Sequence, residues 1–268
     1  MLGRWQLAGV AYRGVRRGER LSRAIMPLVD LLVPRRCANC HASLREAGGN
    51  DWSGRPERWA ESPRGYLCDD CLAALLDPRD RCSRCGEPGV AQPHRGCGQR
   101  VVREIAVLGG YDGDLRLAVL RSKHPSGVGL AGALGRLWTA THLDRCRDWG
   151  VDAVVPVPMH WMRRLRRGGS SVDSLADAVA VDLCLPVVHG LKRWRFTPMQ
   201  NELPRADRKA NVAGAFRTVG RKLAGRRVLL VDDVVTTGAT LASCASVAIQ
   251  GGAVVVFAAA IARADSSA

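Results

Sequence analysis

Two adjacent carboxylates followed by a hydroxyl-rich turn are the residues of this chain best suited to chemistry. Asp232 and Asp233 come directly after the apolar run Val228–Val231, which predicts a buried strand that stops at the two acids. An amphipathic helical pattern begins a few residues later. The turn before that helix consists of Thr236, Thr237, Gly238, Ala239 and Thr240.

This order of residue types suits a sugar phosphate. The carboxyl end of a parallel strand opens onto the ligand crevice of an α/β sheet, so Asp232 and Asp233 are expected where ligands bind. Backbone N–H groups at the start of a helix attract phosphate, and Gly238 permits close approach of the backbone. Carboxylates accept hydrogen bonds from a pair of neighbouring hydroxyls. The sequence therefore predicts a site for a ribose 5-phosphate.

Cysteines form the second constellation. Seven of the ten fall in one stretch, as three C-x2-C pairs and a single following cysteine: Cys37 and Cys40, Cys68 and Cys71, Cys82 and Cys85, and Cys97. A C-x2-C pair points two thiolates at one tetrahedral ion, and two pairs complete a structural zinc site. Because no export signal accompanies the pairs, we expect zinc rather than disulfides.

The spacing allows more than one combination of ligands. One four-thiolate site would use the first two pairs. A second would use Cys82, Cys85 and Cys97, with His94 as the fourth ligand because position 100 is an arginine. An interleaved site made of the second and third pairs is also open on spacing alone. The three scattered cysteines are expected to be small apolar core residues: Cys146, Cys184 and Cys244.

The elements that must position these residues alternate between strands and helices. Apolar runs predict strands at Ile105–Gly110, Ala153–Val157, Pro186–His189, Val228–Val231 and Val254–Ala259. Helical spacing is clearest at Leu130–His142, Val172–Asp182 and Thr240–Gln250, and it also occurs at Leu21–Val33. Such alternation predicts an α/β domain with a parallel sheet flanked by helices.

Composition bounds the class of protein. The chain has 268 residues, 47% hydrophobic and 24% charged, which is globular and excludes wholesale disorder. Its formal net charge is +15, carried mostly by arginine, so an anionic partner is expected. No apolar run is long enough for a membrane span, and arginines interrupt the N-terminal segment. We therefore predict a cytoplasmic protein without a membrane partner.

Five motifs in a fixed order resemble the ComF family. They are the cysteine pairs, VPVPMH at 155–160, TPMQN at 197–201, RKANVAGAF at 208–216 and VLLVDDVVTTGAT at 228–240. The last of these resembles the 5-phosphoribosyl-1-pyrophosphate (PRPP) signature of type I phosphoribosyltransferases. The similarity covers roughly residues 21–263, and the family consists of competence-associated, phosphoribosyltransferase-like proteins with a double zinc ribbon at the N-terminus.

The resemblance implies a type I phosphoribosyltransferase-like sheet and assigns roles to residues. Asp232 and Asp233 would hold the ribose hydroxyls, the 236–240 turn would hold the 5-phosphate, and Mg²⁺ would accompany PRPP and stabilise the departing pyrophosphate. Val157, Pro158 and Met159 would form a pyrophosphate loop. Arg163 and Arg164 would neutralise the departing diphosphate, and Lys123 would be a further phosphate ligand. The expected division is a basic segment at 1–36, a zinc ribbon at 37–100 and a phosphoribosyltransferase-like domain at 101–268.

Two departures from the family pattern concern the substrate. Relatives carry an Arg-Gly-aromatic-Asn-Gln run after the pyrophosphate loop, whereas this chain reads Arg167-Gly-Gly-Ser-Ser171. Thr236 stands where purine-salvage relatives have a carboxylate that deprotonates the base.

The segment 192–211, rich in arginine, is expected to form a lid over the site.

The resemblance also implies a rival function. In this second hypothesis the chain is a non-enzymatic adaptor, which binds single-stranded DNA or a competence or repair protein through its zinc ribbons and arginine-rich surfaces. Four tryptophans lie among arginines in the sequence: Trp52, Trp59, Trp161 and Trp194. An aromatic content of 5% nevertheless does not indicate a surface on which bases stack.

Overall fold

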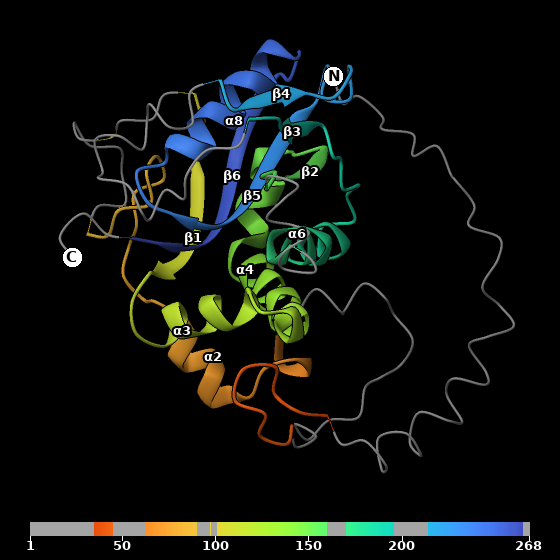
Figure 1. The fold of residues 1–268 in the computed structure, drawn as a ribbon. Coiled ribbons are helices and arrows are strands. Elements are labelled where there is room, and N and C mark those ends of the chain that lie inside the picture. The colour runs from red at the N-terminus through yellow and green to blue at the C-terminus, as the bar shows by residue number, and fades with distance from the viewer. Residues whose placement is uncertain are drawn as a thin grey trace, which may run out of the picture.

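A four-stranded parallel sheet forms the centre of the protein (Figure 1). The computed structural model describes residues 35–44, 63–89, 97, 101–159, 170–195 and 214–264. The strand order is β1-β6-β5-β2. The strands are β1 Ile105–Gly110, β2 Ala153–Pro156, β5 Arg227–Val235 and β6 Val255–Arg263. Nearly every residue of these strands is buried, as expected of a parallel sheet covered on both faces.

Helices cover both faces of the sheet. One face packs against α3 (Gly113–Ser122), α4 (Val128–Trp149) and α6 (Ser171–Asp182). The other packs against α8 (Ala239–Gln250), through a core that includes Leu230, Leu241 and Cys244. The predicted class, an α/β fold with a parallel sheet flanked by helices, is confirmed.

The strand and helix predictions hold for most of these elements, with two corrections. Strand β5 does not stop at the acid pair but continues to Val235, because β6 pairs with it as far as Arg263. The expected strand Pro186–His189 is reduced to an isolated parallel bridge between Val187 and Val154. The sequence also did not predict α3 or the short helix α2 (Asp69–Leu75).

A small antiparallel hairpin lies beside α8. It pairs β3 (Leu191–Arg193) with β4 (Phe216–Thr218), in the register Arg193 opposite Phe216. Figure 1 shows these two strands next to α8, at the end of the molecule away from α2. Two single-turn 3-10 helices complete the described elements, at Pro63–Gly65 and Pro125–Gly127.

The first cysteine pairs share a core with the α/β domain. Cys37, Leu67, Cys71 and Leu75 are buried in the same apolar cluster as Trp138 of α4. The expected boundaries at 36 and 100 stay predictions, and the predicted helix Leu21–Val33 lies outside the described residues. Among the described helices, none is both long and apolar enough to cross a membrane. The cytoplasmic location stays a prediction.

Candidate functional site

The acid pair lies in the part of β5 that extends beyond the end of β2. Strand β2 ends at Pro156, opposite Val231, and the N–H of Val157 donates to the Val231 carbonyl over 2.9 Å. Beyond that point β5 is paired with β6 alone. The two acids are therefore accessible because β2 is short, and not because β5 ends at them.

The two carboxylates point to opposite faces of the sheet. Consecutive residues of a strand alternate between faces, and their contacts follow this rule. Asp233 forms an ion pair with Lys123, 2.9 Å between Oδ2 and Nζ, on the face covered by α3. Asp232 lines a hollow with Gly238 and Leu241 on the α8 face. The two carboxylates therefore contact different parts of the protein, one on each face of the sheet.

Lys123 is the sequence-predicted phosphate ligand that the fold brings to the acid pair. It is the C-cap residue of α3, and its N–H donates to the Leu120 carbonyl over 3.2 Å. Its side chain is 26% exposed and that of Asp233 is 18% exposed, so water only partly screens their attraction. A cation is therefore held against the second acid before any ligand binds.

Asp232 has the more perturbed carboxyl. Burial and the neighbouring Asp233 charge raise its pKa to about 7, against the opposing effects of the Asp233 backbone N–H, Lys123 and Arg193. That N–H donates to Asp232 Oδ1 over 2.9 Å. The nearby Asp233 charge therefore makes a second bare negative charge at Asp232 unfavourable. Each carboxylate separately offers the oxygen atoms that Mg²⁺ prefers as ligands.

The turn after β5, which the sequence analysis expects to hold a phosphate, leads directly into α8. Gly238 adopts a left-handed backbone with φ of 74° and is the N-cap of α8. A non-glycine residue would be strained there. The Thr237 hydroxyl accepts a hydrogen bond from the Ala239 N–H over 3.4 Å. One hollow is lined by Asp232, Thr236, Gly238 and Thr240. Asp232 and the turn could therefore contact the same ligand.

The predicted pyrophosphate loop follows the neighbouring strand. Val157 is buried, while Pro158 and Met159 are partly exposed directly after β2. Because β2 pairs with β5, this loop starts beside the acid pair. Arg163 and Arg164 lie outside the described residues, as does most of the expected lid at 192–211.

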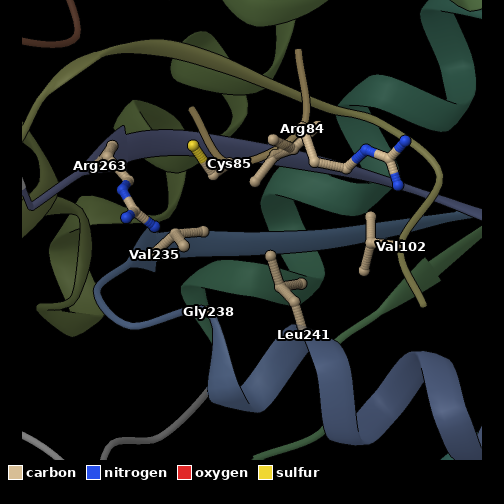
Figure 2. A pocket seen from close by; sticks show the side chains of 8 residues that line it. Arg84, Cys85, Val102, Val235, Gly238, Leu241 and Arg263 are labelled. Carbon is tan, nitrogen blue, oxygen red and sulfur yellow. The ribbon is translucent and has the colours of Figure 1, made fainter. Parts of the chain in front are cut away.

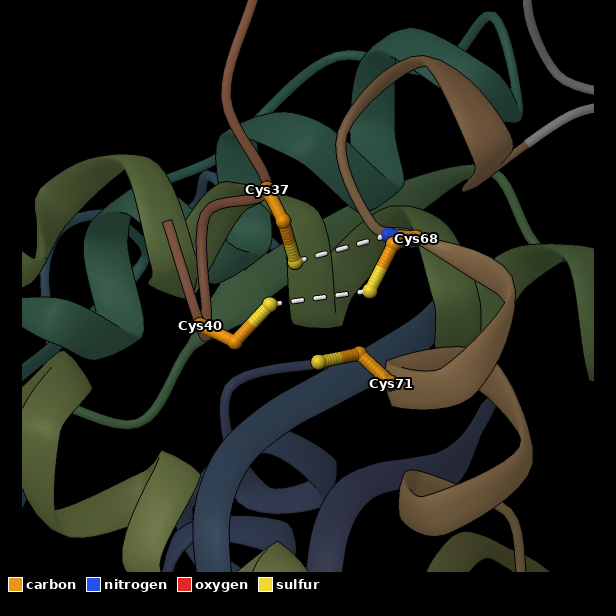
Figure 3. Close-up of side chains that lie close together, drawn as sticks. All are labelled: Cys37, Cys40, Cys68 and Cys71. Atoms are coloured by element: carbon orange, nitrogen blue, oxygen red, sulfur yellow. Dashed lines mark hydrogen bonds between the residues drawn. The ribbon is translucent and has the colours of Figure 1, made fainter. Parts of the chain in front are cut away.

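The first cysteine cluster has the geometry of a four-thiolate metal site. The sulfur atoms of Cys37, Cys40, Cys68 and Cys71 all lie within 4.8 Å of one another (Figure 3). Tetrahedral zinc with Zn–S bonds of about 2.3 Å needs sulfur atoms about 3.8 Å apart, and Cys40 and Cys68 are separated by 3.6 Å. The donor set therefore fits zinc.

Electrostatics at this cluster also favour a cation. Burial opposes ionisation of the Cys37 thiol, but hydrogen bonds from backbone groups of Cys40, Cys68 and Asn39 lower its pKa to about 6. Burial raises the pKa of Cys71 to about 12, and the neighbouring thiols reinforce this effect. The thiolate of Cys37 therefore forms more easily than that of Cys71, and a bound metal ion would favour the thiolate form of both.

The second cluster contains three described cysteines. Cys82 lies 3.4 Å from Cys97 and Cys97 lies 3.7 Å from Cys85, measured between sulfur atoms. This grouping selects the non-interleaved combination from the alternatives that spacing left open. The predicted fourth ligand, His94, lies outside the described residues. Of the scattered cysteines, Cys146 and Cys244 are buried as expected, but the prediction for Cys184 was wrong because it is exposed.

The second cluster also borders the turn of the candidate site. One hollow is lined by Arg84 and Cys85 from the cysteine segment and by Val235, Gly238 and Leu241 from the end of β5 and the start of α8 (Figure 2). Arg263, the last residue of β6, completes the wall and forms an ion pair with Glu87. Sequence reasoning missed both residues, because neither lies in a motif.

Comparison with known proteins finds relatives of this chain over most of its length. No family model matches the chain. It is 32% identical over 199 residues to the DNA utilization protein YhgH of Salmonella typhimurium, covering 71% of this chain and 87% of that protein. The YhgH protein of Escherichia coli K12 is 30% identical with the same coverage. Competence protein F of Haemophilus influenzae is 28% identical over 214 residues, covering 77% of this chain and 87% of the relative.

Among solved structures, the allosteric regulatory enzyme of purine biosynthesis is similar over 50% of this chain and 26% of its own, with 23% identity and a TM-score of 0.36.

Proposed function

Since the chain belongs to the ComF family, we propose that it binds PRPP with Mg²⁺ at the carboxyl edge of its sheet. The observation that carries the proposal is the meeting of three segments distant in sequence. Lys123, the start of the 157–159 loop and the Asp232–Asp233 pair lie at one edge. They supply a cation and a backbone loop for phosphate groups, and carboxylates for the hydroxyl groups of the same small ligand.

Each part of the site matches one part of the ligand. The carboxylates accept hydrogen bonds from the ribose hydroxyls or bind Mg²⁺. The turn at 236–240 and the N-terminus of α8 bind the 5-phosphate. Lys123 and the loop after β2 face the pyrophosphate. Ligand binding then replaces the Lys123–Asp233 contact with contacts from both groups to the ligand.

If transfer follows binding, the protein acts by orientation and charge. The bond between the anomeric carbon and the pyrophosphate oxygen breaks, the electron pair leaves with pyrophosphate, and an acceptor forms a new bond to that carbon. Lys123 neutralises part of the leaving charge, and Mg²⁺, for which the acid pair offers oxygen ligands, would supply further positive charge. Thr236 cannot act as a carboxylate base, so an acceptor that needs no deprotonation by this turn suits the site best.

Calorimetric titration tests this function. PRPP with Mg²⁺ is titrated into the zinc-loaded protein and into the Asp232→Asn, Asp233→Asn double variant. An Asp144→Asn, Asp148→Asn double variant on α4 is the control for charge. We expect binding by the wild type and the control, and affinity at least about 100-fold weaker in the acid-pair variant. Absence of binding by folded wild type would refute the proposal.

A second function is supported by the β3–β4 hairpin. Trp194 is 51% exposed, and the Arg217 guanidinium lies 3.7 Å from its ring centroid. The stretches 190–195 and 214–227 contain no acidic residue and eight cationic ones: Lys192, Arg193, Arg195, Arg217, Arg221, Lys222, Arg226 and Arg227. Together with relatives named for DNA utilization and competence, Trp194 and the exposed cations among these residues fit single-stranded DNA.

Salt dependence separates DNA binding from the PRPP site. We expect binding of a fluorescent oligothymidylate to weaken steeply as salt rises. It should weaken by roughly tenfold in Trp194→Ala, since each stacked base contributes about 1–3 kcal/mol. The Arg147→Gln variant, on α4, should bind as the wild type does. Equal binding by Trp194→Ala would remove the hairpin from the DNA surface.

A further inference from the structure

We infer that the Glu87–Arg263 ion pair couples the second cysteine cluster to the 236–240 turn, so that metal at this cluster holds the turn in its binding conformation. Neither the cysteine pairs nor the 228–240 motif predicts a link between the second cysteine cluster and the turn. The inference rests on the proposed function only for the identity of the ligand. The link itself is a property of the ligand-free protein.

One end of the link belongs to the cysteine cluster. Glu87 lies two residues after Cys85, and its backbone carbonyl accepts a hydrogen bond from the Cys82 N–H over 2.8 Å. Between them, Gly86 has a left-handed backbone with φ of 76°, and a Cβ built on it would lie 3.2 Å from Val107 of β1. The turn that carries two of the sulfur ligands is therefore packed tightly against the sheet.

The other end belongs to the turn. Arg263 pairs with Val235, which is the last residue of β5 and directly precedes Thr236. The N–H of Ala264 donates to the Val235 carbonyl over 2.8 Å. The position of Arg263 therefore fixes the point from which the turn departs.

The ion pair that joins the two ends is well shielded from water. The side chain of Arg263 is 10% exposed and that of Glu87 is 15% exposed. Removing one partner of a buried ion pair leaves the other charge uncompensated. Through this pair, Glu87 is joined to a residue that lines the same hollow as Cys85 and Gly238. The cluster and the turn should consequently move together.

A metal ion at the second cluster would act on this link through the turn that carries Cys82 and Cys85. Three thiolates on one ion fix the relative positions of Cys82, Cys85 and Cys97. Without the ion, the relative positions of these cysteines, and therefore of Glu87 beside them, are less constrained. We therefore expect loss of this metal to loosen a turn that contains none of its ligands.

Hydrogen exchange of the backbone amides at 236–240, in ligand-free protein, is the direct readout. Glu87→Gln keeps the shape of the side chain and removes its charge. Its matched control is Glu104→Gln, which breaks the Arg145–Glu104 pair at the far end of β1. We expect Glu87→Gln to retain its full zinc content and to exchange the turn amides about tenfold faster. Glu104→Gln should leave their exchange unchanged.

Cysteine variants test the role of the metal. Cys97→Ser removes a ligand of the second cluster without altering the wall of the hollow, and Cys40→Ser removes a ligand of the first. Each should lose one zinc equivalent, but only Cys97→Ser should accelerate exchange at the turn. If Glu87→Gln does not fold, Arg263→Lys, which retains a cation, replaces it and should give an intermediate rate.

Two outcomes would overturn the coupling. One is an unchanged turn in Glu87→Gln. The other is an unchanged turn in Cys97→Ser despite loss of its zinc. PRPP titration of the same variants should show about tenfold weaker binding wherever exchange is accelerated. If the wild type itself does not bind PRPP, the proposed function fails, while the exchange rates still decide the coupling.

Discussion

At the scale of residues, the site consists of two neighbouring carboxylates and one lysine that forms an ion pair with the second of them. Asp232 and Asp233 are adjacent in sequence and point to opposite faces, and only Asp233 has a lysine against it. Asp232 keeps a raised pKa. The acid pair could be predicted from the sequence because its motif is contiguous. The contact with Lys123 could not, because it depends on how α3 ends relative to β5.

Asp232→Asn should stabilise the protein at pH 8. The pKa of Asp232 is raised from 3.8 to about 7 in the folded protein. Folding therefore favours the protonated carboxyl. The stability this contributes is complete below about pH 4 and is lost as pH rises through 7. We expect the variant to exceed the wild type by roughly 2–4 kcal/mol at pH 8 and by little at pH 4.

Urea unfolding at several pH values measures this difference. Asp144→Asn is the control, since the side chain of Asp144 is 92% exposed. A pH-independent difference between Asp232→Asn and wild type would contradict the raised pKa.

Lys123→Met should weaken ligand binding more than it affects folding. The variant leaves Asp233 without its 2.9 Å partner, at an expected loss of about 1 kcal/mol for a partly exposed pair. PRPP affinity should fall at least about tenfold, because a phosphate contact is lost as well. Lys222→Met, an exposed lysine elsewhere, should change neither quantity. An unaltered PRPP affinity in Lys123→Met would exclude this lysine from the site.

At the scale of elements, helix packing explains why α4 and α6 lie so close. A Cβ built on Gly135 of α4 would lie 2.8 Å from the Leu175 carbonyl oxygen and 3.0 Å from Ala178 Cβ, both on α6. Periodicity predicted both helices, and apolar runs predicted the four strands of the main sheet. The β3–β4 hairpin escaped prediction because each of its strands has only three residues, too few to show a period.

Two glycines of α4 give opposite expectations. Gly135→Ala should destabilise the protein by about 1–3 kcal/mol, since the added methyl group forces the helices apart. At Gly132 a Cβ would have no neighbour within 4 Å. Gly132→Ala should therefore stabilise by about 0.5–1 kcal/mol through helix propensity alone. Thermal unfolding compares them, and two changes of the same sign would contradict the packing.

At the scale of the whole molecule, the cysteine clusters are parts of the α/β structure. Cys37 and Cys71 are buried in the same cluster as Trp138, and Arg263 joins the second cluster to β6. The spacing of the cysteines predicted the ligands. It could not predict this integration, because side-chain packing between distant segments leaves no periodic signal.

Loss of the first metal site should consequently destabilise the main core. Cys71→Ser should release one zinc equivalent and lower the free energy of unfolding by at least about 2 kcal/mol. Cys184→Ser changes an exposed thiol outside both clusters, and its effect should stay within about 0.5 kcal/mol. Zinc content and urea unfolding measure both. Equal stability of Cys71→Ser and wild type would contradict a shared core.

The measurement that tests the central claim most directly is the hydrogen-exchange footprint of PRPP with Mg²⁺ on the wild-type protein. The account predicts slower exchange in three separated segments at once, around Lys123, after β2 at Val157 and Met159, and from Asp232 to Thr240. Helix α6 should be unaffected. Protection confined to the cysteine segments, or absent at saturating PRPP, would contradict a phosphoribosyl site at this edge of the sheet.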